Sequence, residues 1–267
     1  MKTVLFVSHS SDLYGAEKSL FDLAKSINRE CFLPIVLFPR EGPFREEIEN
    51  IGIKTYITRL PTWSYITGIG PFHFIRSLLS RLLLTASSII SIIRIIKKER
   101  IDLVYTNSLV VYSGAVAAYI SRRPHIWHVS EILGKHSGLR YFLPSRLLLI
   151  IISKLSNAII ANSQATARQF KQLTHEKVSV IYCGVNVEEY RRVHLHADSS
   201  IETKGKWQVA VIGRLYELKA QDDAIRAVSI AKKAIPEIEL LLIGHEDKRY
   251  KDQKKNIFYF QKKPKGN

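Results

Sequence analysis

Cysteine is almost absent from this 267-residue sequence, which contains only Cys31 and Cys183. The two lie in different segments, and neither belongs to a Cys-x-x-Cys pair or to a histidine–cysteine cluster with metal-ligand spacing. A disulfide framework and a structural zinc site both need more cysteines than this. The sequence therefore argues against both, and a reducing cytoplasm is the natural compartment for the chain.

Long apolar runs are missing as well. The nearest candidates for a membrane span, 82–93 and 147–153, fall short of the roughly 18 residues required and are bounded by Arg or Lys. The apolar run 4–7 near the amino terminus is too short for the hydrophobic region of a signal peptide. We therefore expect no span of the bilayer and interpret 4–7 as a buried first strand.

Several common motifs are also absent. The sequence has no GxxxxGK[ST] phosphate-binding loop, no GxGxxG fingerprint and no GxSxG nucleophile elbow. It has no Asp-x-Asp pair either, which removes the usual metal clamp for the diphosphate of a sugar nucleotide. Negative charge on such a group would have to be met by the basic side chains Arg214 and Lys219 and by helix ends.

Basic residues dominate the charge balance, with 40 Lys and Arg against 24 Asp and Glu and a formal net charge of +16. Such an excess favours anionic partners, namely phosphorylated substrates, anionic lipid head groups or nucleic acid, and the alternative is a solvated basic surface. The aromatic residues do not interleave with a basic patch, and no nucleic-acid recognition motif occurs. We therefore expect no nucleic-acid partner.

The sequence does contain a regular alternation of short β-rich runs and helix-periodic segments. This alternation is typical of a parallel sheet covered by helices on both faces, so we predict an α/β fold of the Rossmann-like kind. Predicted strands are 3–7, 33–38, 54–57, 102–105, 125–129, 158–161 and 178–182, and predicted helices are 16–27, 43–50, 111–120, 139–155 and 163–173.

A polar stretch without periodicity follows Tyr190, and the alternation then restarts with a strand at 207–212, a helix at 219–234 and a strand at 239–243. We predict a first domain at 1–190, a linker at 191–205 and a second domain of the same kind at 206–267. About 60 residues follow the linker, whereas a doubly wound domain usually needs ~100. We therefore expect the second domain to be incomplete and the chain to be cut short.

Three segments at predicted strand ends are candidates for binding or catalysis. Gly15, between the first strand and the first helix, would let the backbone approach a ligand at the helix amino terminus, although a plain turn also uses one glycine. Arg214 and Lys219 follow a strand of the second domain and suit a diphosphate, although charged loops are common. His128 ends a predicted strand and could carry a proton or donate a hydrogen bond, although most histidines are structural.

The apolar helix expected at 72–98 has two interpretations. It carries one polar stripe, formed by Arg76, Ser80, Ser87, Ser91, Arg94 and Lys98. The helix either packs on the sheet or lies on an anionic membrane surface with its basic residues near the head groups.

At these positions the sequence closely resembles glycosyltransferase family 4, the retaining two-domain enzymes of the GT-B fold. The similarity covers nearly the whole chain in the right order. Residues 14–20 resemble the Gly-Gly-Ala-Glu segment of the family, and 180–186 resemble its Ile-Pro-Asn-Gly-Val-Asp turn. Residues 102–108 and 161–163 are similar to two further segments, and the most specific match is Gly213-Arg214-Leu215 with Lys219, followed by 240–244.

This resemblance implies transfer of a hexose from a UDP- or GDP-sugar to a glycan or lipid-linked acceptor in cell-envelope polysaccharide synthesis. It implies retention of anomeric configuration, no cofactor and no required metal, in the cytoplasm or peripherally on the inner face of the cell membrane. Arg214, Lys219 and Gly15 would bind the donor diphosphate and His128 would face the transferred sugar. Further candidates for the pocket lining are Asn107, Glu131, Gly213 and Glu17.

The sequence departs from the family in two places. Tyr14 replaces the first glycine of the pair, and the late pair of glutamates that contacts the donor sugar and ribose has no counterpart after Gly244. Glu41 and Glu49 have the right spacing but lie in the first domain, so we reject them. We expect this chain to be inactive alone, and the alternative function is a non-catalytic remnant that binds acceptor or an anionic membrane surface.

Overall fold

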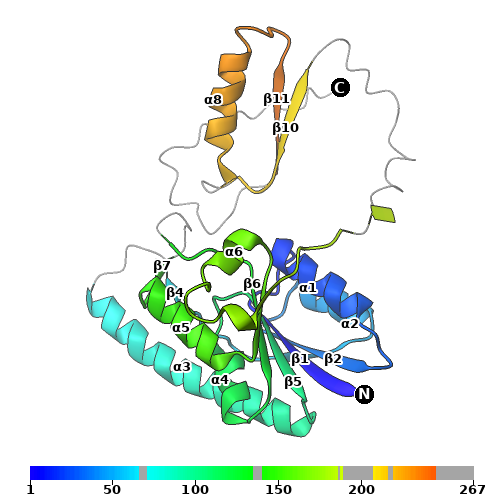
Figure 1. Ribbon diagram of the computed structural model, residues 1–267, viewed down its shortest axis with the longest axis vertical. Helices are drawn as coiled ribbons and strands as arrows, with labels where there is room; N and C mark the ends of the chain where they lie inside the picture. The colour runs from blue at the N-terminus through cyan, green and yellow to red at the C-terminus, as the bar shows by residue number, and fades with distance from the viewer. Residues whose placement is uncertain (66–70, 135–139, 186, 189–206, 216–218, 245–267) are drawn as a thin grey trace. The chain divides into compact units, whose positions relative to one another are not determined.

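The computed structural model describes residues 1–65, 71–134, 140–185, 187–188, 207–215 and 219–244. The chain divides into two compact units, Met1–Val185 and Asn186–Asn267, and each is described by itself (Figure 1). The linker predicted at 191–205 lies outside the described residues, so the predicted domain boundaries stay a prediction.

The first unit is built on a seven-stranded sheet in which all neighbouring strands are parallel. The strand order is β3-β2-β1-β5-β6-β8-β9, so the chain moves outward from β1 in one direction and then restarts at β5 in the other. The strands are β1 (Lys2–Ser8), β2 (Phe32–Phe38), β3 (Lys54–Ile57), β5 (Leu103–Asn107), β6 (His125–Val129), β8 (Ala158–Ala161) and β9 (Val178–Val180).

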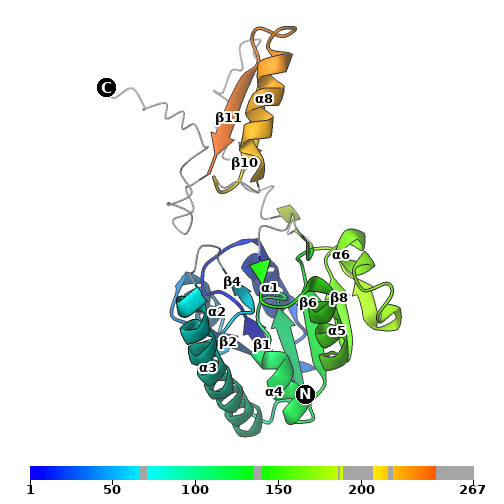
Figure 2. The same cartoon turned by 90° about the vertical axis from the view of Figure 1, so that its left-hand side faces the viewer.

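Helices cover both faces of this sheet, as Figures 1 and 2 show. One face packs against α1 (Gly15–Ser26) and α2 (Pro43–Asn50) through a cluster that includes Val4 and Phe6 of β1. The other face packs against α3 (Pro71–Lys98), α4 (Ser113–Ile120) and α5 (Ser145–Leu155). Successive side chains of β1 point to opposite faces, so Leu5 and Val7 belong to this second core.

Several predicted elements have different bounds in the structure. The helix predicted at 139–155 begins only at Ser145, because Pro144 lacks the backbone donor that a helix interior needs. The residues before it include β7 (Arg140–Tyr141), which pairs in antiparallel fashion with β4 (Ser64–Tyr65). The strand predicted at 178–182 ends at Val180.

The helix predicted at 163–173 is also shorter, because α6 (Gln164–Arg168) ends at Arg168 and the chain continues in turns. The hydrogen bonds from Phe170 N to Ala167 O and from Leu173 N to Phe170 O span three residues instead of four. Phe170 is completely buried in the core beside β6 and β8, and the tighter turns accompany that burial. A 3-10 turn at His175–Lys177 then leads into β9.

The long helix α3 packs on the sheet through its carboxyl-terminal half. Ile92, Ile95 and Ile96 are buried against the sheet and α4, whereas Leu83 and Ile90 are exposed. The side chains of 71–82 lie outside the described residues, and so do those of Arg76 and Ser80, two of the six residues of the predicted polar stripe. Packing on the sheet therefore accounts for the described half of the helix.

The described part of the second unit is one strand–helix–strand module. β10 (Gln208–Ile212) and β11 (Glu239–Ile243) are parallel, and α8 (Gln221–Ala231) lies between them in sequence (Figure 1). The strands end in close contact, because a Cβ atom on Gly244 would lie 1.8 Å from the carbonyl oxygen of Gly213. Only glycine fits at position 244, which explains the residue that follows β11.

Candidate functional site

The candidate site of the first unit lies where the direction of the strand order reverses, between β1 and β5. Open parallel sheets bind ligands outside the carboxyl ends of their strands at such a switch point. The register places Ser8 beside Asn107 and Asn107 beside His128, so the ends of β1, β5 and β6 form one row. The polar residues at and just beyond this row therefore share one edge of the sheet.

His128 is held by one ring nitrogen and leaves the other without a partner. Its Nδ1 lies 2.8 Å from the hydroxyl of Tyr105 on β5, while its Nε2 is buried and no described residue hydrogen-bonds with it. Burial lowers the pKa of His128, opposed by the nearby charge of Glu131, and burial raises the pKa of Tyr105. A neutral imidazole that accepts from the tyrosine hydroxyl carries its own proton on Nε2. In that tautomer the free Nε2 of His128 donates a hydrogen bond to a ligand, and in the opposite tautomer it accepts one.

Glu131 fixes the two loops that follow β5 and β6. Its carboxylate accepts hydrogen bonds from the Ser108 hydroxyl and from the backbone N–H groups of Leu109 and Ser130, the last two at 3.2 and 3.1 Å. Ser108 has a left-handed backbone with φ of 79°, an uncommon conformation for a side chain other than glycine. Strained backbone of this kind persists only when its surroundings hold it, and it clusters at functional sites.

Asn107 connects the sheet edge to the first helix. Its side-chain amide donates to the carbonyl oxygen of Ala16 at 3.1 Å, and the residue is almost completely buried. Both Asn107 and Glu131 therefore position the backbone of the site, which sequence patterns alone did not indicate.

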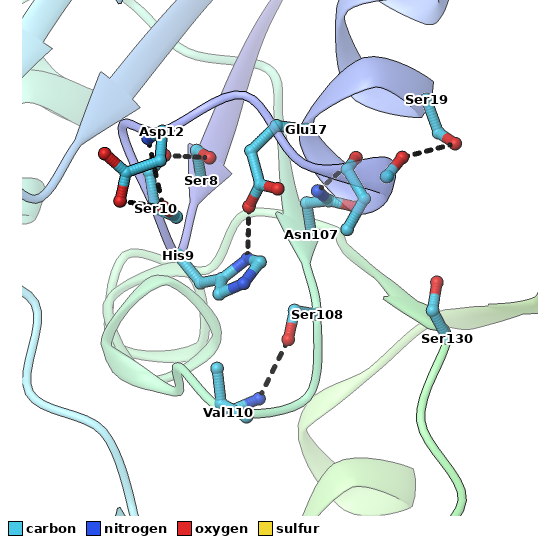
Figure 3. A network of polar contacts seen from close by, with 12 residues as sticks. Ser8, His9, Ser10, Asp12, Glu17, Ser19, Asn107, Ser108, Val110 and Ser130 are labelled. Carbon is cyan, nitrogen blue, oxygen red and sulfur yellow. Dashed lines mark hydrogen bonds and ion pairs between the residues drawn. The ribbon is translucent and has the colours of Figure 1, made fainter. Parts of the chain in front are cut away.

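The start of α1 contributes Gly15 and Glu17 to this edge. A Cβ atom added to Gly15 would meet nothing within 4 Å, so the backbone there is open to a ligand. The Glu17 side chain is buried, with its Oε1 3.2 Å from Nδ1 of His9, on the loop after β1 (Figure 3). Sequence analysis missed His9, which lies one residue beyond the position of β1 that is level with His128 of β6.

In the second unit, Arg214 and Lys219 lie around the carboxyl end of β10. The stem of Lys219 lies next to Gly213, at 3.8 Å from the position that a Cβ atom of Gly213 would take. The backbone carbonyl of Arg214 accepts a hydrogen bond of 2.8 Å from Gln221, the first residue of α8. Two cations at a strand end and a helix amino terminus form a favourable environment for an anion. The predicted pocket that combines them with Gly15 stays a prediction.

Two further observations concern metals and membranes. Within the described ranges, no group of three or more His, Cys, Asp or Glu residues could hold a metal ion. Among those same residues, none of the helices combines the length and the apolar character that crossing a bilayer requires. Glu41 and Glu49, which we rejected as donor-binding residues, both pair with Arg45 on α2.

Comparison with known families gives the decisive observation. The sequence profile of Glycosyltransferase Family 4 matches residues 14–189, which is about two thirds of the chain. The chain belongs to glycosyltransferase family 4. The matched segment includes Gly15, Asn107 and His128, and it ends before Arg214.

Solved structures related to this family-4 chain share its fold at low sequence identity. Anabaena Alr3699/HepE, in complex with UDP and glucose, is 23% identical with a TM-score of 0.65, covering 94% of this chain and 63% of that one. A glycosyltransferase from Rickettsia africae is 15% identical with a TM-score of 0.56, and the match covers 93% of this chain and 69% of that one. Acinetobacter baumannii MurG is 13% identical with a TM-score of 0.51, and the match covers 90% of this chain and 68% of that one. No protein of curated function matches the sequence.

These comparisons confirm the predicted fold class, an α/β fold of the GT-B type whose first unit is a complete Rossmann-like parallel sheet. The family-4 chain spans 63% of the length of the Anabaena protein.

Proposed function

We propose that this chain carries the acceptor-side part of a retaining glycosyltransferase that moves a hexose from a UDP- or GDP-sugar to a glycan or lipid-linked acceptor. We assign the pathway to cell-envelope polysaccharide synthesis. Membership of family 4 supports the reaction class, and the complexes of the Anabaena protein with UDP and UDP-glucose support a nucleotide-sugar donor. The observation that carries the proposal is the buried, unpartnered Nε2 of His128 at the switch point.

In this reaction His128 binds the transferred sugar. Its Nε2–H donates to a sugar hydroxyl or to the departing oxygen, and Tyr105 holds the ring from the other side. A hydrogen-bond donor that is already in place needs no reorganisation while the glycosidic bond breaks. Such preorganisation is the usual source of electrostatic stabilisation in enzymes.

Within the second unit, Arg214 and Lys219 hold the diphosphate of the donor. Arg supplies a bidentate fork and Lys a point charge, so together they stabilise the negative charge that develops on the departing diphosphate. This arrangement requires no metal ion. Because the space beside Gly15 is open, a methyl group there would obstruct the ligand and leave the fold intact.

Titration calorimetry of the purified chain with UDP-glucose and GDP-mannose tests this proposal. We expect one of them to bind, with equal affinity with and without EDTA, and we expect Arg214→Ala or Lys219→Ala to weaken binding by about tenfold or more. Lys232→Ala, at the exposed carboxyl end of α8, is the matched control and should bind like wild type. Equal binding by all variants, or loss of binding in EDTA, would contradict the proposal.

A second candidate function is binding to an anionic membrane surface without catalysis. The outer face of α3 favours it, because Leu83 and Ile90 are 75% and 49% exposed and lie on the same side as the exposed Arg94. Apolar and basic side chains on one helix face are typical of interfacial helices. The fraction of protein that co-sediments with phosphatidylglycerol vesicles should fall in the variant Leu83→Ser, and wild type should bind neutral vesicles more weakly than anionic ones. Binding that neither change affects would remove this candidate.

A further inference from the structure

His9 and Glu17 form a titratable pair at the switch point that the proposed transfer reaction does not use. The Glu17 side chain is 1% exposed and the His9 side chain is 25% exposed. Glu17 Oε1 and His9 Nδ1 lie 3.2 Å apart, and Figure 3 shows the two side chains facing each other. This contact has ion-pair distance but not hydrogen-bond geometry, and both atoms are buried without a hydrogen-bond partner among the described residues.

Packing alone does not explain this pair. A carboxylate in the first turn of α1 gains from the helix dipole, but that gain is small and also exists for an exposed side chain. A carboxylate this deeply buried loses most of its hydration, and apolar residues of similar volume often stabilise such a site as well or better.

The loop that carries His9 is held in place by its own hydrogen bonds. The Ser8 hydroxyl donates to the carbonyl oxygen of Ser10, and Arg40 pairs with Asp12 at 2.6 Å. Ser11 is fixed from the opposite side, because its hydroxyl donates to the carbonyl oxygen of Arg40. A side chain on such a fixed loop presents the same geometry to every ligand, which is what a binding site requires.

The pairing also determines which ring nitrogen of His9 is available. A carboxylate next to Nδ1 favours the proton on that nitrogen, so Nε2 carries a lone pair when the ring is neutral. Unlike the Nε2 of His128, the Nε2 of His9 is not buried without a partner. The two histidines, at the ends of β1 and β6 on either side of β5, therefore lie at the same edge of the sheet.

We propose that His9 and Glu17 form a binding site for a carbohydrate hydroxyl, in which Nε2 of His9 accepts a hydrogen bond from a hydroxyl of the acceptor sugar. Glu17 is the positioning residue that keeps the imidazole in the accepting tautomer. This inference rests on the proposed transferase function and adds to it the residues that recognise the acceptor. It assigns His9 and Glu17 to the acceptor, whereas His128 binds the transferred sugar and Arg214 and Lys219 serve the donor diphosphate.

Saturation-transfer NMR on the full 267-residue chain with methyl α-glucopyranoside, in the presence of UDP, tests this site. We expect transfer to the pyranoside in wild type, and a fall of about fivefold in His9→Ala and in Glu17→Gln, because one hydrogen bond is lost. Glu30→Gln, an exposed glutamate beyond α1, is the matched control and should behave like wild type. Transfer that is unchanged in His9→Ala would overturn the proposal.

A measurement on wild type does not depend on the variants folding. In protein labelled with ¹⁵N-histidine, the Nε2 resonance of His9 should report the Nδ1–H tautomer and should shift when the pyranoside is added. The opposite tautomer, or a resonance that the pyranoside leaves unmoved, would overturn the proposal. A purely structural His9–Glu17 pair predicts an unmoved resonance and a lowered melting temperature in His9→Ala.

Two further comparisons separate this proposal from its alternatives. If UDP-glucose displaces the pyranoside from His9, the pair binds the donor sugar and the acceptor assignment is wrong. If UDP-glucose binds normally through Arg214 and Lys219 while the pyranoside leaves His9 unaffected, the hydroxyl site fails and the transferase proposal stands. If the pyranoside shifts His9 while no sugar nucleotide binds, the hydroxyl site stands and the donor part of the proposed function fails.

Discussion

Two glycines of the first unit differ sharply in the space around them. Gly114 at the start of α4 packs so close to the sheet that a Cβ atom would lie 2.8 Å from Thr106 Oγ1 and 3.0 Å from Val7 Cγ2. Around Gly15 the same atom would meet nothing within 4 Å. The first glycine therefore serves packing, and the second leaves room that the protein itself does not fill.

Gly114→Ala should destabilise the protein by about 1 kcal/mol. Overpacking costs about 1–3 kcal/mol, and the better helix propensity of alanine returns up to about 1 kcal/mol of that. Gly15→Ala should leave the free energy of unfolding unchanged or slightly raised. Urea denaturation of the two variants measures both effects, and a gain of stability in Gly114→Ala would show that α4 moves away from the sheet without cost.

The burial of His125 makes the free energy of unfolding depend on pH. The residue is buried at the start of β6 with its Nε2 2.9 Å from Thr106 Oγ1, and burial lowers the pKa of His125 to about 3. Below the ordinary histidine pKa near 6.5, His125 binds a proton in the unfolded chain but stays neutral in the folded chain. The stability contribution is therefore complete above that pH and is lost as the pH falls, by up to about 1.4 kcal/mol per pH unit.

Urea midpoints measured between about pH 7 and pH 5 test this dependence. Wild type should lose stability with acid, and His125→Gln, which keeps a hydrogen-bonding group but does not titrate, should show a flatter profile. His128 contributes in the same direction, because burial also lowers its pKa, so some slope should remain in the variant. Parallel profiles for wild type and His125→Gln would rule out His125 as a source of the slope.

Among the elements, α3 combines a buried and an exposed face in one helix. Ile96 is 2% exposed against the sheet, whereas Ile90, less than two turns earlier, is 49% exposed. Ile96→Ala should lower the free energy of unfolding by about 2–5 kcal/mol through the cavity it leaves. The matched variant Ile90→Ala should change it by less than about 1 kcal/mol. Similar losses in both variants would mean that the outer face of α3 is also covered.

The elements that could be predicted from the sequence are those whose pattern is local. β6 and β8 were predicted with their observed bounds, because buried strands of a parallel sheet read as short apolar runs between polar turns. The start of α5 was predicted too early although Pro144 marks it locally, whereas the end of α6 was wrong because tertiary packing, including the burial of Phe170, decides it. The β4–β7 pair joins segments more than 70 residues apart, and no local pattern could indicate it.

The candidate site was only partly predictable for the same reason. His128 was found because it ends a recognisable strand, and Gly15 because it begins a helix. The role of Glu131 in fixing two loops, and the pairing of His9 with Glu17, depend on how the chain folds back after each strand. Residues that act through such contacts carry no signal in sequence spacing.

At the scale of the whole molecule, the first unit presents two histidines, His9 and His128, at its switch point, and the second unit presents two cations, Arg214 and Lys219, at a strand end. The net charge of +16 suits a protein whose ligand is an anion, since it raises the local concentration of such ligands. Family 4 membership and this division of roles support one account, in which the first unit binds sugars and the second unit binds the diphosphate.

The most direct test of this account is saturation-transfer NMR with UDP-glucose, comparing wild type with His128→Ala and with the control His125→Gln. The account predicts saturation of the glucose protons in wild type and in the control, and a loss of about fivefold or more in His128→Ala, because the donor on Nε2 is removed. Saturation of the glucose protons that is equally strong in His128→Ala would contradict it.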